Sequence, residues 1–180
     1  MKTPFDRIPV ICGGDTVLRP VAEEDAPALE EMVRDDEVYR FLPTFLYERN
    51  NGDISKVIRE MYGDIFQRKE SLLLGIYRGE GKEFCGLAEV YGYKEAIHKA
   101  CIGYRLRKCC WGSGIATKAA GLLTKYLLSE TDVETITAST MVENEASARV
   151  LEKTGFIWTA RGVGEDWGYP EPTIADKWFL

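Results

Sequence analysis

The segment Trp111–Thr117 carries the residues best suited to chemistry in this chain. It joins a β-like run, Ala100–Arg107, to an amphipathic helical pattern. Four of its residues are small and keep side-chain bulk away from the turn: Gly112, Ser113, Gly114 and Ala116. The first-turn amides of a helix have no internal acceptors, and the helix dipole adds partial positive charge there. The segment therefore predicts a site for a phosphate or pyrophosphate.

Two other phosphate-binding motifs do not fit this segment. It lacks Gly-x-x-x-x-Gly-Lys-[Ser/Thr], which disfavours a nucleoside triphosphatase loop. It also lacks Gly-x-Gly-x-x-Gly, because the third glycine position falls on Thr117, which disfavours a dinucleotide-binding fold. A phosphoryl-transfer enzyme is disfavoured too, since no metal-binding cluster of carboxylates accompanies the turn.

A second segment, Asn144–Phe156, follows a strand-like run at Glu134–Thr140. Asn144 suits a helix N-cap, and Gly155 stands where a helix end favours a left-handed residue. Together the two segments resemble the two signature motifs of the GNAT N-acetyltransferase superfamily. In that family the amides of the first motif hold the pyrophosphate of acetyl-CoA, and the helix of the second lies along the pantetheine arm.

The resemblance extends over nearly the whole chain and is closest to the Rim-type branch, named for N-terminal acetylation of ribosomal proteins. The matching stretches are Leu18-Arg-Pro20, Phe41-Leu-Pro43, Trp111-Gly-Ser-Gly-Ile-Ala-Thr117 and Asn144-x-x-Ser147 with Leu-Glu-Lys-x-Gly-Phe156. Arg149 lies on the second motif's helix, where a cation could reach the ribose phosphate. Acetyl-CoA contacts are thus expected at Leu106, Trp111, Gly112, Ser113, Gly114, Ile115, Ala116, Thr117, Asn144 and Arg149.

Acetyl transfer to an amine requires a proton donor for the departing thiolate. Many family members carry a tyrosine four residues before the glycine of the second motif, but this chain has Leu151 there. In the Rim-type branch the hydroxyl comes from the serine of Asn-x-x-Ser, so the resemblance makes Ser147 the catalytic acid. A plain capping or surface role for Ser147 is the alternative.

The attacking amine must also lose a proton. Related enzymes often carry a glutamate in the strand before the first motif, where this chain has Cys101. Glu89, in the preceding strand, is the best remaining carboxylate and is our candidate base; burial among apolar neighbours would raise its proton affinity. His98, the only histidine, and a water relay stay open as alternatives.

Composition sets the broad class. The chain has 180 residues and 45% hydrophobic residues, which suits one domain spanning 1–180. A net charge of −6 argues against nucleic acid as a partner and is compatible with a cationic acceptor. We expect no signal peptide and no membrane segment. We also expect no metal site, because the five cysteines lack zinc-type spacing. A cytoplasmic location with reduced thiols is expected.

The elements that must position these residues form an α/β pattern. A strand at 16–21 precedes a helix that starts at Asp25-Ala-Pro27 and a second helix at 54–67, which Gly63 breaks or shortens. Three consecutive strands (71–78, 84–93 and 100–107) lead to the helix that begins after the glycine turn at 112–114. Further strands are expected at 134–140, 156–160 and 173–180. The predicted class is a mixed α+β GNAT fold with a central, mostly antiparallel mixed sheet of six or seven strands and helices on both faces. The resemblance implies that the strands at 100–107 and 134–140 splay apart.

The sequence thus predicts an acyl-CoA-dependent N-acetyltransferase. Acetyl-CoA would be the co-substrate, and the acceptor a primary amine on a small molecule or a protein N-terminus, attacking directly in a ternary complex. The alternative is a non-catalytic acyl-CoA-binding or sensor module on the same fold. Either a monomer or a homodimer is compatible with the sequence.

Overall fold

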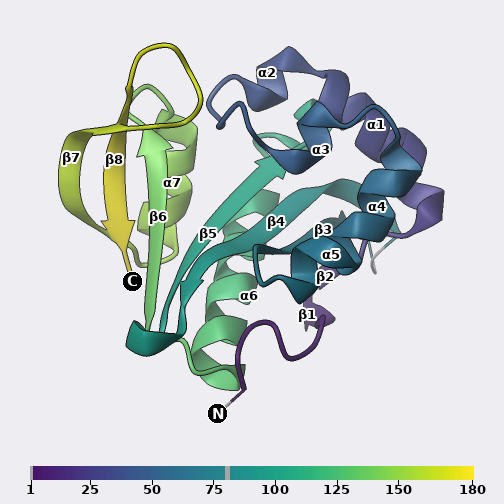
Figure 1. The fold of residues 1–180 in the computed structure, drawn as a ribbon, viewed down its shortest axis with the longest axis horizontal. Coiled ribbons are helices and arrows are strands. Elements are labelled where there is room, and N and C mark those ends of the chain that lie inside the picture. Colours follow the sequence, from purple (N-terminus) through teal and green to yellow (C-terminus); the bar gives the residue numbers. More distant parts are fainter. Residues whose placement is uncertain (1, 80–81) are drawn as a thin grey trace.

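An eight-stranded sheet organises the chain in the computed structural model, which describes residues 2–79 and 82–180. Its strand order is β1-β2-β3-β4-β5-β6-β8-β7 (Figure 1). Neighbouring strands are antiparallel except β5 and β6, which are parallel. The strands are β1 Ile11–Gly13, β2 Thr16–Arg19, β3 Ser71–Arg78, β4 Glu83–Lys94, β5 Lys99–Leu106, β6 Thr135–Met141, β7 Ile157–Glu165 and β8 Thr173–Phe179.

Helices cover both faces of this sheet (Figure 1). On one face lie α6 and α7; on the other lies a layer of five short helices of four to nine residues, α1 to α5. The helices are α1 Ala26–Arg34, α2 Asp36–Tyr39, α3 Tyr47–Asn50, α4 Ile54–Tyr62, α5 Asp64–Gln67, α6 Ile115–Glu130 and α7 Glu145–Lys153. Short 3₁₀ turns occupy Glu23–Asp25, Glu95–Ile97 and Lys108–Cys110.

The predicted fold class is confirmed, with one correction to the strand count. Eight strands are present rather than six or seven, because Ile11–Gly13 adds a strand to the edge of the sheet by pairing with β2. Three residues are too few to show the alternation by which a strand is recognised in a sequence. The expected interruption at Gly63 is present: α4 ends at Tyr62 and α5 begins at Asp64.

The core is divided by the sheet into two apolar clusters. One joins α6 and α7 to the sheet through residues such as Leu123 and Trp178, and the other joins α1 and α4 through residues such as Leu29 and Met61. Strand β3 is buried along almost its whole length, as expected for a strand covered on both faces. Within the described residues, no helix is long and apolar enough to cross a membrane.

The parallel pair β5 and β6 stays together for only three positions. Lys99 pairs with Thr135, Ala100 with Ile136 and Cys101 with Thr137. Beyond Cys101 the two strands diverge (Figure 1), while β6 continues beside β8 as far as Met141. The splaying that the family resemblance implies is therefore present, and the backbone of β5 after Cys101 lacks a neighbouring strand on that side.

Candidate active site

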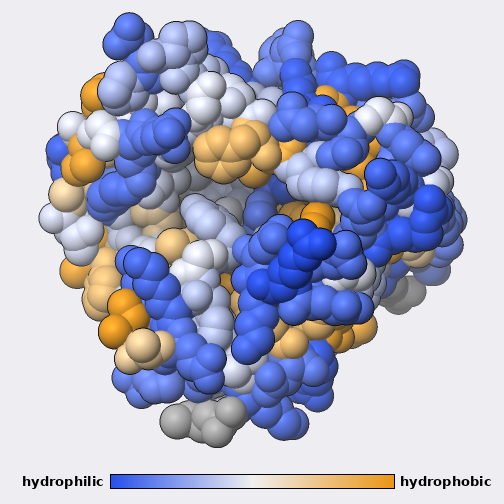
Figure 2. Space-filling model, viewed as in Figure 1, coloured by the Kyte–Doolittle hydropathy of each residue, from blue (hydrophilic) through white to orange (hydrophobic). Residues whose placement is uncertain are grey.

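A cavity of about 460 Å³ lies at the gap between β5 and β6. Its walls come from β4, β5, β6, α7, the segment 41–47 before and within α3, and the segment 165–167 at the end of β7 and just beyond it. The surface is hollowed in this region, between the layer of short helices and the C-terminal strands (Figure 2). The cavity thus unites segments far apart in the sequence.

The turn before α6 has the geometry of an anion site. Gly114 is the N-cap in the left-handed region with φ 78°, and Gly112 also has positive φ at 69°. The first intrahelical bond runs from the Lys118 amide to the Gly114 carbonyl at 3.1 Å. The amides of the three preceding residues, Ile115, Ala116 and Thr117, therefore lie in the unsatisfied first turn.

The space beside this turn is open. A Cβ atom placed on Gly112 or Gly114 would meet nothing within 4 Å. The Ser113 hydroxyl does not fill it, because it donates a 2.6 Å hydrogen bond back to the Cys110 carbonyl. A phosphate group could approach the amides of the first turn through this space.

Leu106 connects the turn to the gap. Trp111, which is half exposed, donates from Nε1 to the Leu106 carbonyl at 2.9 Å. The amide of Arg107 donates to the Cys85 carbonyl of β4 at 2.8 Å. Because backbone groups of successive strand residues point to opposite sides, those of Tyr104 and Leu106 face the gap rather than β4. This arrangement suits backbone hydrogen bonding to a ligand extended along β5.

Ser147 lies at the gap and contacts a tyrosine that sequence reasoning missed. The Asn144 side chain caps α7, accepting from the Ser147 amide at 3.2 Å. The hydroxyl oxygens of Ser147 and Tyr104 are 2.8 Å apart, and both residues line the cavity. Burial raises the pKa of Tyr104 well above its ordinary value, which keeps the phenol protonated at neutral pH. Only the fold joins the two residues, which are 43 positions apart.

Glu89 also faces the cavity, and it has two partners. Its carboxylate accepts a 2.5 Å hydrogen bond from the Ser71 hydroxyl and a 2.6 Å bond from Nη1 of Arg105. Its side chain is 13% exposed. Across the sheet it pairs with Gly103, where a Cβ atom would lie 3.6 Å from the Tyr91 ring. The arrangement brings a carboxylate and the Ser147 hydroxyl to the same cavity.

The other candidates occupy different positions. His98 lies in the turn between β4 and β5, where its Nδ1 is 3.3 Å from Asp132; it does not line the cavity. Cys101 stands where the strands part, with its sulfur 3.1 Å from the Thr137 hydroxyl. Leu151 is buried on the cavity wall.

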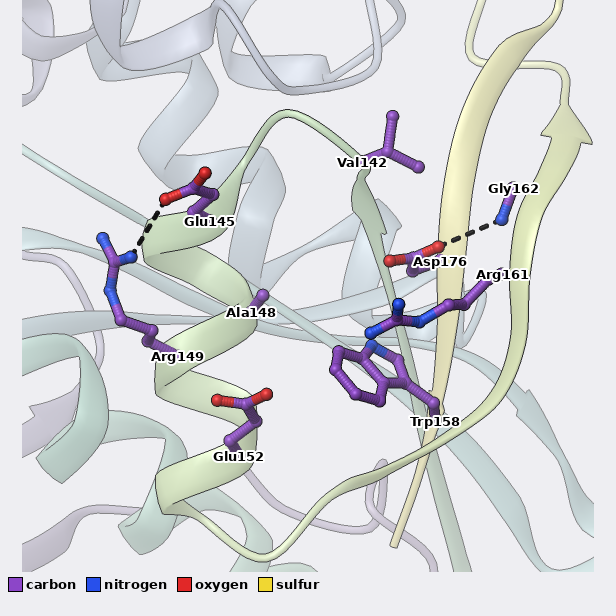
Figure 3. Close-up of a pocket in the computed structure, with 9 residues that line it drawn as sticks. All are labelled: Val142, Glu145, Ala148, Arg149, Glu152, Trp158, Arg161, Gly162 and Asp176. Carbon is purple, nitrogen blue, oxygen red and sulfur yellow. Dashed lines mark hydrogen bonds and ion pairs between the residues drawn. The ribbon is translucent and has the colours of Figure 1, made fainter.

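Arg149 belongs to a different surface. It borders a groove along α7 and strands β7 and β8, and its side chain lies on the side of the helix away from those strands (Figure 3). There it pairs with Glu145 at 3.2 Å. In this conformation it does not line the cavity at the gap. Its expected contact with the ribose phosphate stays a prediction.

One group of side chains in the described residues could hold a metal ion. Glu83, Cys85 and Cys110 bring their ligand atoms within 4.8 Å of one another, away from the cavity. Both oxygens of Glu83 are engaged by Arg78, at 2.5 and 2.7 Å. Burial raises the pKa of both thiols, which disfavours the thiolate that a metal requires.

Comparison with known proteins places this site in a family. The profile of the Acetyltransferase (GNAT) domain matches residues 15–157. The chain is 28% identical over 168 residues to "Uncharacterized N-acetyltransferase YoaA" of Bacillus subtilis (strain 168), covering 93% of each protein.

Two solved structures show the same fold. Mycobacterium smegmatis RimJ in complex with CoA-disulfide superposes with a TM-score of 0.81 at 21% identity, covering 99% of this chain and 89% of that one. RimL, a ribosomal L7/L12 alpha-N-protein acetyltransferase in complex with coenzyme A, gives 0.79 at 18% identity, covering 96% and 97%. With a matching profile over most of its length, a sheet parted at β5 and β6 and a glycine turn opening α6, the chain belongs to the GNAT acetyltransferase family.

Proposed function

We propose that this protein transfers the acetyl group of acetyl-CoA to a primary amine, by direct attack within a ternary complex. The observation that carries the proposal is the cavity at the gap between β5 and β6, because Glu89 and Ser147 both line it. A candidate proton acceptor and a candidate proton donor thus share one space with the unpaired backbone of β5.

The chain offers acetyl-CoA a continuous set of contacts. The first-turn amides of α6 would hold the pyrophosphate, aided by the helix dipole. The gap-facing backbone groups of Tyr104 and Leu106 would bind the pantetheine arm, and the start of α7 at Asn144 would flank it. Acetyl-CoA supplies the activated acyl group, as a thioester. A backbone amide in the gap would stabilise the negative charge that develops on the acyl oxygen.

The protons are handled by two sets of side chains. Glu89 would accept the proton that the amine must lose, directly or through one water molecule. Ser147 would donate to the departing sulfur, and the neighbouring Tyr104 hydroxyl, 2.8 Å away, would replace that proton and regain one from water that enters as the products leave. A tyrosine whose pKa burial has raised is a poor acid by itself, so we assign Tyr104 the role of orienting and resupplying Ser147.

The charges around the cavity favour a cationic acceptor. Five ionisable acidic and basic side chains line it: the carboxylates of Glu70, Glu89, Glu165 and Asp166, and the guanidinium of the buried Arg105. Glu165 is paired with Lys177, and Glu70 lies 4.0 Å from Arg68. Two carboxylates, Glu89 and Asp166, then face the cavity with one guanidinium, that of Arg105. A primary amine enters as an ammonium ion and would be attracted before it is deprotonated. Aromatic walls such as Phe41 and Trp167 would bind its carbon skeleton.

The test is turnover of acetyl-CoA with a panel of amines and N-terminal peptides, read by mass spectrometry. Ser147→Ala and Glu89→Gln are each expected to lower kcat by about 10²–10³-fold on an accepted amine, in the range typical of acid–base groups. The matched controls are Ser129→Ala on the exposed end of α6 and Glu83→Gln, an arginine-paired carboxylate on β4 outside the cavity. Both should retain wild-type rates. Binding of acetyl-CoA without turnover of any acceptor would favour the acyl-CoA sensor instead.

A further inference from the structure

Behind the cavity lies a buried cluster of charges, which sequence analysis did not anticipate. Arg105 projects from β5 between two carboxylates: its Nε is 2.6 Å from Glu48 on α3, and its Nη1 is 2.6 Å from Glu89 on β4. The side chains of Arg105 and Glu48 are only 3% and 1% exposed. The cluster therefore links the layer of short helices to the two strands that bear the candidate site.

The charges in this cluster do not balance. One guanidinium faces two carboxylates, and the burial penalty on Arg105 is outweighed by Glu48 and Glu89, which raise its pKa. The other polar neighbours are neutral: Tyr39 on α2 donates to Glu48 at 3.1 Å, and Ser71 on β3 donates to Glu89 at 2.5 Å. Burial, with Glu48, raises the pKa of Tyr39, so it stays a neutral donor.

Two further residues complete the surroundings of Glu89. Tyr91, on the same strand, is held neutral because burial raises its pKa, and Glu70, before β3, lines the same cavity with Arg68 4.0 Å from its carboxylate. Among the described residues, Arg105 is the only cation that contacts Glu89. The cluster thus leaves about one negative charge uncompensated next to the cavity.

This imbalance matters for proton transfer. A carboxylate paired one-to-one with a guanidinium is stabilised in its ionised form and becomes a poor proton acceptor. Glu48 shares the same guanidinium at 2.6 Å, so Arg105 does not pair one-to-one with Glu89. The same excess charge would also attract the ammonium group of an acceptor.

We propose that Glu48 and Arg105 are positioning residues that together hold Glu89 toward the cavity and set its readiness to accept a proton. The inference rests on the proposed function, in which Glu89 removes a proton from the acceptor amine. Glu48 directly follows residues 41–47, which form one wall of the cavity. Its contact with Arg105 therefore fixes that wall relative to Glu89 as well.

The test compares pH profiles of kcat/KM for the wild type, Glu48→Gln and the double variant Glu48→Gln/Arg105→Gln. Without the Glu48 charge, Arg105 pairs with Glu89 only. The acidic limb of the kcat/KM profile should therefore move to lower pH by about one unit. Plateau activity should fall severalfold, because Glu89 becomes the weaker base. Neutralising both partners should return the limb most of the way to its wild-type position.

A matched control separates this effect from a loss of stability. Asp25 is a buried carboxylate near Arg19 that accepts a 2.6 Å bond from Tyr77, and it does not line the cavity. Asp25→Asn should lower the melting temperature without moving the acidic limb. If Glu48→Gln behaves in the same way, Glu48 is structural only and the proposal is overturned.

A second readout does not depend on turnover. The titration of the Glu89 carboxylate can be followed by NMR with ¹³C-labelled glutamate, assigned with Glu89→Gln. A downward displacement of that titration in Glu48→Gln supports the inference even if no acceptor is found, in which case only the proposed function fails. An unchanged titration overturns the inference even in an active enzyme. Wild-type turnover by Glu89→Gln would overturn the base assignment and the inference with it.

Discussion

Gly114 offers the sharpest test of the pyrophosphate site, because its substitution separates strain from binding. At φ 78° an alanine is strained by about 1 kcal/mol. For a chain of this size, that cost corresponds to a fall in melting temperature of about 2–4 °C. The added methyl group would meet no protein atom within 4 Å, so it would occupy the space through which a phosphate reaches the α6 amides.

The loss of affinity can be estimated in the same way. Gly114→Glu adds a charge of the same sign as the pyrophosphate. At about 4 Å such a pair repels by about 1–4 kcal/mol, between the limits for water and for a protein surface. Because 1.4 kcal/mol is a factor of ten in Kd, we expect acetyl-CoA affinity to fall by about fivefold to 10³-fold in Gly114→Glu. Gly114→Ala should show a smaller loss, from its methyl group alone.

Gly14→Ala is the matched control. Gly14 has φ 61° and open space around its would-be Cβ, but it lies in the β1–β2 turn. Isothermal titration calorimetry with acetyl-CoA and thermal melts should show similar losses of stability in both alanine variants and a loss of affinity only at Gly114. Wild-type binding by Gly114→Glu would refute the assignment of the pyrophosphate to this turn. Equal losses of affinity at both positions would show that the effect is not local.

Three further predictions follow from specific contacts. Gly86→Ala should unfold more easily and bind acetyl-CoA more weakly in the same calorimetric assay. The added Cβ would lie 2.1 Å from the Arg105 carbonyl and force β4 away from β5. Unchanged stability would contradict the observed strand spacing. Tyr104→Phe should lower kcat by about tenfold with little change in KM for acetyl-CoA, and a still lower kcat for Ser147→Ala would agree with an indirect role for Tyr104. Cys85 and Cys110 should resist iodoacetamide at pH 8 while the exposed cysteines react, because burial raises the pKa of both thiols and keeps them protonated at that pH. Raising the pH should speed the modification of Cys85 and Cys110, which peptide mass spectrometry would detect.

Local patterns in the sequence determined much of the fold. Strand β3 was predicted with its observed bounds, and the helix starts at Ile115 and Glu145 follow from signals a few residues long, a glycine turn and an asparagine cap. Such features depend on backbone conformation and first-turn hydrogen bonds, which neighbouring residues decide. The short edge strand β1 was missed because three residues show no alternation, and its contacts with β2 and α6 come from distant parts of the chain.

Some of the candidate site residues could also be identified from the sequence. Glu89 and Ser147 were selected from residue type and family pattern, and the structure brings both to the cavity. Their partners could not be selected in that way. Tyr104 contacts Ser147, which is 43 positions away in the sequence. Glu48 contacts Arg105 from α3, a helix in the layer of short helices.

The sequence by itself therefore determined the glycine turn before α6, the helix caps and the family, since each depends on residues close together in the chain. Only the tertiary structure decided which charges share the environment of Glu89 and where Arg149 points. The physical reason is that electrostatic coupling depends on distance in space and on burial. Both are set by how β4, β5 and α3 pack, and no local pattern encodes them.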